Sequence, residues 1–62
     1  NMKSVFVIWE YEQGSPFDRE EPLYPFYLSR FLAEQALKKL GPEPEWGYRE
    51  IREERVSSEV EG

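Results

Sequence analysis

Glu10 and Glu12 come closest, by residue type and spacing, to a pair that could do chemistry. Residues two positions apart project from the same face of a strand, about 7 Å from each other. Such a carboxylate pair can hold Mg²⁺ or exchange protons with a substrate. The alternative is structural, because Arg49, Arg52 and Arg55 can pair with these carboxylates across neighbouring strands. We favour the ion pairs.

The remaining inventory of reactive groups is small. The chain has no His and no Cys, so neither an imidazole base nor a thiol nucleophile is present. No serine lies in a nucleophile-elbow pattern. Asp18, Glu20 and Glu21 lack the spacing of a calcium loop. The sequence therefore predicts no catalytic residue, no cofactor and no metal site, and a function other than that of an enzyme.

The composition also limits the possible size of the core, the possible partners and the location of the protein. A chain of 62 residues forms one small domain that buries little surface, and without Cys or His it has no disulfide or zinc site to compensate. The net charge of −5 opposes binding to nucleic acid or to an anionic membrane. No segment approaches the roughly 18 apolar residues of a membrane span. We expect a cytoplasmic protein, and the high charge with five prolines leans toward a thermophilic source.

The run SVFVIWEYE, residues 4–12, predicts the first strand, because it is rich in β-branched and aromatic residues. It is apolar on both faces, which is typical of a central strand. Residues 13–21 are expected to form a loop. The segment PLYPFY, residues 22–27, predicts a second strand at an edge, because Pro22 and Pro25 cannot donate to a ladder.

The stretch FYLSRFLAEQALKKLG predicts an amphipathic helix. Ser29 is the expected N-cap, and Gly41 followed by Pro42 is the stop signal. Its apolar stripe is expected to lie on the first strand, on a face that the pattern does not identify. The stripe consists of Leu32, Ala33, Ala36, Leu37 and Leu40.

Residues 45–56 are ambiguous between helix and strand, and we favour a charged edge strand over 46–56. The predicted fold is α+β: a ββαβ chain with a three-stranded antiparallel sheet in the order 2-1-3 and one helix on one face. The domain is expected to span residues 2–56, followed by a flexible tail over 57–62.

Three segments together resemble a small family of uncharacterised bacterial and phage domains. They are the β-rich start VFVIWEYE, the entry FYLSRFLAEQAL into an Ala-rich helix and the late strand WGYREI. The resemblance covers residues 3–56 and implies the same strand, strand, helix, strand pattern. It implies no activity and no functional residues.

One helix covers one face of a sheet, so the other face of the first strand is expected to expose an apolar patch. We predict a small interaction or regulatory domain that acts as a homodimer, sheet face against sheet face, or on a protein partner. The predicted interface residues are Val5, Val7, Trp9, Tyr11, Trp46 and Tyr48.

Two other functions stay open. One is an acidic phage-encoded inhibitor that occupies a basic site on a host enzyme. A single acidic patch would favour it, formed by Asp18, Glu20, Glu21, Glu43 and Glu45. The other is an enzyme that uses Glu10 and Glu12.

Overall fold

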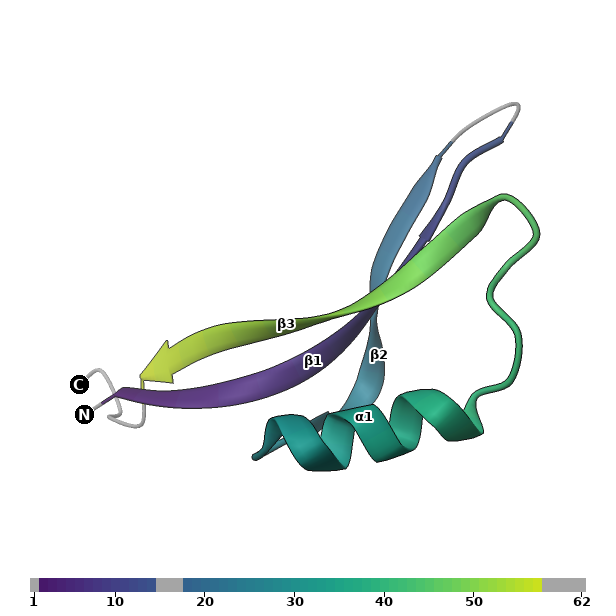
Figure 1. The fold of residues 1–62 in the computed structure, drawn as a ribbon. Coiled ribbons are helices and arrows are strands. Elements are labelled where there is room, and N and C mark those ends of the chain that lie inside the picture. Colours follow the sequence, from purple (N-terminus) through teal and green to yellow (C-terminus); the bar gives the residue numbers. More distant parts are fainter. Residues whose placement is uncertain (1, 15–17, 58–62) are drawn as a thin grey trace.

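β1 (Met2–Glu12) is the central strand of a three-stranded antiparallel sheet (Figure 1). β2 (Arg19–Tyr27) pairs with one edge of β1, and β3 (Gly47–Ser57) pairs with the other. α1 (Arg30–Lys39) connects β2 to β3 and lies against one face of the sheet. The α+β fold predicted from the sequence, with the order 2-1-3, is confirmed.

The computed structural model describes residues 2–14 and 18–57. The segment that was ambiguous in the sequence is a strand, because it pairs with β1 along the whole of its length. Ser57 is the last residue of β3, and the remainder of the predicted tail, 58–62, lies outside the described residues.

The helix covers the face of β1 that carries Phe6 and Ile8. The guanidinium of Arg30 lies 5.3 Å from the centre of the Phe6 ring, and Ala33 is fully buried where the helix meets the sheet. A small residue at this position lets the helix axis approach the strands closely. The opposite face of the sheet is called the open face below, and β1 contributes five of its residues: Lys3, Val5, Val7, Trp9 and Tyr11.

Local signals set the ends of the helix as predicted. The Ser29 hydroxyl accepts a hydrogen bond from the Leu32 amide at 3.2 Å, which satisfies a donor that the helix leaves unpaired. Gly41 follows the C-cap with a φ of 82°, a left-handed conformation that glycine adopts without steric cost.

The predicted apolar stripe of the helix is only partly correct. Leu32 and Leu40 are 50% and 44% exposed, whereas Ala33 is buried and Ala36 and Leu37 are half-buried. The sheet beneath is narrow, so it covers the centre of the stripe and leaves its margins in solvent.

β2 is longer than predicted and begins at Arg19, so the predicted loop over 13–21 was too long. Its first residues continue the ladder, with Arg19 opposite Glu12 and Glu21 opposite Glu10. The register then shifts between Phe6 and Ile8 of β1, in the part of β2 that contains Pro25. Both neighbours of β1 are edge strands, as expected.

No helix in the described part of the chain is long and apolar enough to cross a membrane.

Candidate protein-interaction surface

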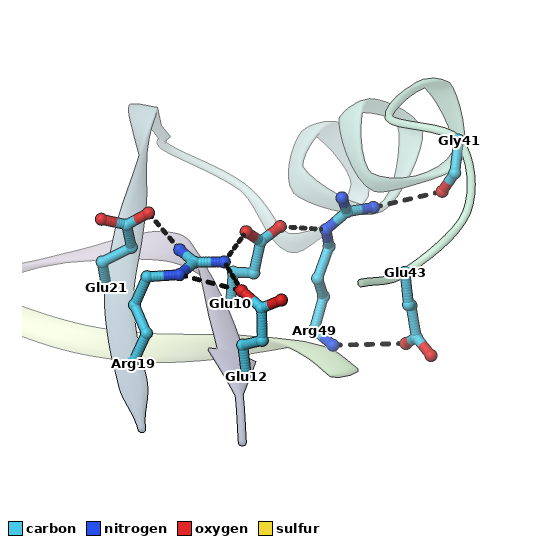
Figure 2. A network of polar contacts seen from close by, with 7 residues as sticks. All are labelled: Glu10, Glu12, Arg19, Glu21, Gly41, Glu43 and Arg49. Carbon is cyan, nitrogen blue, oxygen red and sulfur yellow. Dashed lines mark hydrogen bonds and ion pairs between the residues drawn. The ribbon is translucent and has the colours of Figure 1, made fainter. Parts of the chain in front are cut away.

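Glu10 accepts hydrogen bonds from arginines on both neighbouring strands (Figure 2). Arg49 of β3 donates from Nε to one carboxylate oxygen at 2.7 Å, and Arg19 of β2 donates to the other at 2.7 Å. Arg19 also bonds Glu12 at 2.8 Å and forms an ion pair with Glu21. The predicted cross-strand ion pair between Glu10 and Arg49 is confirmed.

The other two expected partners of the glutamates, Arg52 and Arg55, were wrong. Arg55 lies opposite Ser4, six positions along β1 from Glu10. Arg52 lies opposite Val7, three positions along β3 from Arg49, so it projects from the open face rather than toward Glu10. Arg19 was missed because the sequence predicts a loop over residues 13–21. Nothing in the sequence gives the register that places Arg19 opposite Glu12.

Arg49 also forms hydrogen bonds with the connection between α1 and β3. A terminal guanidinium nitrogen donates to the Gly41 carbonyl at 3.1 Å, and the Arg49 backbone amide donates to Glu43 at 3.2 Å. Figure 2 shows this arginine between the end of the helix and Glu10. The network therefore ties β2, β1, β3 and the α1–β3 connection together.

The two arginines determine the protonation of Glu10. Hydrogen bonds from Arg19 and then from Arg49 stabilise the carboxylate and lower its pKa, against a smaller opposing effect of burial. Both carboxylate oxygens are already engaged, which makes Glu10 a poor proton donor. Among residues 2–14 and 18–57, no group of three or more acidic side chains is arranged to hold a metal ion.

Glu10→Gln should lower stability by about 2 kcal/mol at neutral pH, because it leaves the largely buried Arg49 without its charged acceptor. It should also flatten the acid limb of the stability curve. A carboxyl with a depressed folded pKa stabilises the fold above its unfolded pKa of about 4.3, and this contribution disappears as pH falls through the folded pKa. Urea titrations between neutral pH and pH about 3 measure both effects.

The matched control for Glu10→Gln is Glu34→Gln, which removes a carboxylate from the exposed surface of the helix. Its stability should follow the wild type at each pH. An acid limb in Glu10→Gln as steep as that of the wild type would contradict the assigned role of Glu10.

On the open face, Arg52 lies over two aromatic rings. Its guanidinium carbon is 4.7 Å from the centre of the Trp9 ring and 5.5 Å from that of Tyr11. Its Nε donates to Glu50 at 2.9 Å. Both aromatic side chains donate hydrogen bonds to β3. Trp9 Nε1 donates to Glu54 at 2.6 Å, and the Tyr11 hydroxyl donates to Glu50 at 2.9 Å.

These contacts shift the pKa values of Glu50, Tyr11 and Arg52. The hydrogen bond from Arg52, followed by that from Tyr11, lowers the pKa of Glu50. Desolvation and the hydrogen bond to Glu50 raise the pKa of Tyr11, and the bond to Glu50 raises that of Arg52. At neutral pH the open face therefore carries a neutral phenol between a carboxylate and a guanidinium.

The expectation of a bare apolar patch on this face was wrong. Val7 is 1% exposed, and Val5, Trp9 and Tyr11 are half-buried. Arg52 covers apolar surface because long charged side chains can lay their stems and planar groups over rings while their heads stay hydrated. The sheet-to-sheet homodimer stays a prediction, without the exposed patch on which it was based.

Part of the exposed aromatic surface lies at one end of the sheet, in a cleft of about 510 Å³. Trp46 is 68% exposed and Tyr48 50%, and Tyr48 stacks on Tyr11 with ring centres 4.6 Å apart. We call this the aromatic cleft. Its lining consists of Tyr11, Glu12, Gln13, Asp18, Arg19, Glu20, Trp46, Gly47 and Tyr48.

Backbone contacts hold the floor of the aromatic cleft. The Gln13 amide donates to the Trp46 carbonyl at 2.9 Å, and the Gly47 amide donates to the Pro44 carbonyl at 3.2 Å. Gly47 lies so close to β1 that a Cβ atom there would be 1.7 Å from the Tyr11 carbonyl oxygen. In the sequence, Gly47 indicated only that a helix is unfavourable, and its role in the cleft was missed.

Three of the six predicted interface residues meet in the aromatic cleft: Tyr11, Trp46 and Tyr48. The other three, Val5, Val7 and Trp9, lie along the open face away from it. They do not line the cleft, because the open face of β1 runs from one end of the sheet to the other.

The acidic residues divide between separate places. Asp18 and Glu20 line the aromatic cleft, whereas Glu21 pairs with Arg19 and Glu43 accepts from the Arg49 amide. Figure 2 shows Glu21 and Glu43 on opposite sides of Glu10. Of the five acidic residues considered in the sequence, two therefore line the cleft, and the five do not form one common patch.

Comparison of the chain with protein-family models, with curated proteins and with solved structures gave no match. The resemblance to small bacterial and phage domains stays an expectation from the sequence.

Proposed function

We propose that this protein is a small non-enzymatic interaction domain that binds a cationic segment of a protein partner in the aromatic cleft. The observation that carries the proposal is the exposure of Trp46 and Tyr48 beside carboxylates in one concave site. Aromatic side chains are enriched at protein interfaces.

Charge favours a basic partner. Glu12, Asp18 and Glu20 line the cleft with a single cation, Arg19, which is already paired with Glu10, Glu12 and Glu21. Lysine and arginine side chains are attracted to aromatic faces and to carboxylates alike. The chain shows such a contact internally, where Arg52 lies over Trp9.

The alternative function, an acidic inhibitor that occupies a basic site on another enzyme, uses the same cleft. The single acidic patch that would favour it is reduced to Asp18 and Glu20, which lie beside Trp46. Both functions belong to a protein that acts through contact, and we place that protein in the cytoplasm.

The test is an NMR titration of backbone amides with a capped peptide of alternating lysine and glycine. A peptide of alternating glutamate and glycine is the control ligand. We expect the lysine peptide to shift amides around Glu12 and Trp46, and the glutamate peptide to leave them in place. The affinity should fall several-fold in Trp46→Ala and stay unchanged in Tyr24→Ala, an 80% exposed aromatic outside the cleft.

Two outcomes would contradict the proposal. One is a set of shifts spread evenly over the acidic surface, which indicates charge attraction without a site. The other is an equal loss of affinity in Trp46→Ala and Tyr24→Ala.

A further inference from the structure

β1 and β3 continue beyond the end of β2 as a two-stranded ribbon (Figure 1). β2 ends at Tyr27, opposite Phe6, whereas β1 and β3 stay paired as far as Met2 and Ser57. In the described part of the chain, no backbone hydrogen bond reaches residues 2–5 from the side of β2. This side of residues 2–5, called the free edge below, presents unpaired N–H and C=O groups.

The free edge lacks the devices that protect the other edges of the sheet. The outer edge of β2 carries Pro22 and Pro25, which cannot donate to an added strand. The outer edge of β3 is dense in Arg and Glu over residues 49–55. The free edge has no proline, and Lys3 is its one charged residue.

A two-stranded ribbon is at best marginally stable in water, and a third strand with an apolar face is needed for independent stability. The ribbon carries apolar side chains that an added strand could cover: Val5 is half-buried and Val56 is 43% exposed. We propose that the free edge pairs with the same edge of a second copy of this chain. The two copies are antiparallel about a two-fold axis, so that their sheets become continuous.

Register and charge favour a second copy as the occupant. Residues directly opposite each other project to the same face, so a two-fold axis must place one residue opposite itself. An axis at Lys3 sets two ammonium groups face to face, which is destabilising. An axis at Ser4 sets Lys3 opposite Val5 of the other copy, whose cross-strand neighbour on that face is Glu54. An axis at Val5 brings Ser4 to Phe6 and Met2 to Ile8, and both Phe6 and Ile8 already pair with β2. The axis at Ser4 limits the new pairs to residues 3–5, which have no partner on β2.

The axis at Ser4 therefore places Lys3 of each copy across Val5 from Glu54 of the other, two strand spacings away and of opposite charge. The dimer also leaves the aromatic cleft open, because the cleft surrounds Gly47 and the free edge lies at the end of the sheet near Ser57. Self-association through the free edge and binding in the cleft are independent, and each can fail without the other.

Cysteine cross-linking tests the predicted register, since the chain has no Cys of its own. In the proposed dimer the two Ser4 Cβ atoms are about 4.5–5.5 Å apart, close to disulfide geometry. Arg55 lies opposite Ser4 on β3, so its two copies are about 14 Å apart, three strand spacings. With oxidised glutathione, Ser4→Cys should form a disulfide dimer at least about tenfold faster than the control Arg55→Cys.

Light scattering over a range of concentrations tests association itself. The mass of the wild type should rise from 7.4 kDa toward twice that value, and Lys3→Glu should shift this rise to higher concentration. Circular dichroism confirms that each variant is folded. A wild-type mass that stays at 7.4 kDa at every concentration would overturn the proposal. So would a dimer in which Ser4→Cys cross-links no faster than Arg55→Cys, the result expected from sheet-to-sheet association.

Discussion

Replacing Gly47 with alanine should unfold the domain or bring it close to unfolding. The added Cβ would lie 1.7 Å from the Tyr11 carbonyl oxygen and 2.8 Å from the Glu12 Cα. Both are backbone atoms of the central strand, so no side-chain rotation relieves the overlap. β1 and β3 must separate at this end, which also removes the floor of the aromatic cleft.

We expect Gly47→Ala to cost about 3 kcal/mol or more. A chain of this length has a total stability of about 3–9 kcal/mol. The measurement is thermal unfolding followed by circular dichroism. The matched control is Gly14→Ala, because a Cβ at Gly14 would meet no atom within 4 Å. A Gly47→Ala melting temperature equal to that of Gly14→Ala would show that the close approach of β3 to β1 is incorrect.

Ile8→Ala should be the most damaging truncation of an apolar side chain. Ile8 is 2% exposed and lies on the helix-covered face of the central strand, between Leu23 of β2 and Ile51 of β3. Removing its outer carbons takes away buried surface and leaves a cavity, at a cost of about 2–5 kcal/mol. In the described part of the chain, only Val7 and Ala33 are buried to the same extent.

The control for Ile8→Ala is Leu32→Ala, which also removes a large apolar side chain but from a site that is 50% exposed. Alanine is a good helix former, so we expect a loss below about 1 kcal/mol at position 32. Urea unfolding measures both variants. Equal losses would mean that the helix rests on the sheet through the Leu32 side of its stripe, as the sequence pattern alone allowed.

The aromatic cleft and the free edge lie at opposite ends of one sheet, and each is a proposed contact surface. Two such surfaces would suit a domain whose own core is small, because contacts outside the chain would add to its stability. A dimer through the free edge presents two aromatic clefts. A partner with two basic segments would then bind more tightly than its single segments, by an amount that depends on the spacing between them.

Local chemistry was sufficient to predict the helix, the central strand and the edge position of β2. Ser29 and Gly41 delimit the helix through hydrogen bonds and a φ angle that depend on a few neighbouring residues. The β-branched and aromatic run around Val7 made β1 a central strand. Pro22 and Pro25 placed β2 at an edge, because a missing amide is a property of the residue itself.

Register was decided only by the tertiary structure. Side chains alternate between faces with a period of two, so a shift of one residue moves every side chain of a strand to the other face. The sequence could therefore propose Arg49 and Arg52 alike as partners of Glu10, although they project from opposite faces. It could not place Arg19, whose partners depend on where β2 joins the ladder.

The candidate surfaces depend on the same long-range pairing. Trp46, Tyr48 and Tyr11 meet because Gly47 lies opposite Glu12, 35 residues away along the chain. The free edge exists because β2 ends at Tyr27 while β1 and β3 continue. The sequence by itself determined the central strand, the edge position of β2 and the helix, since those preferences are local, whereas pairing with β1 decided that β3 is a strand. Which side chains share a face and which edge stays unpaired was left to the packing of the whole chain.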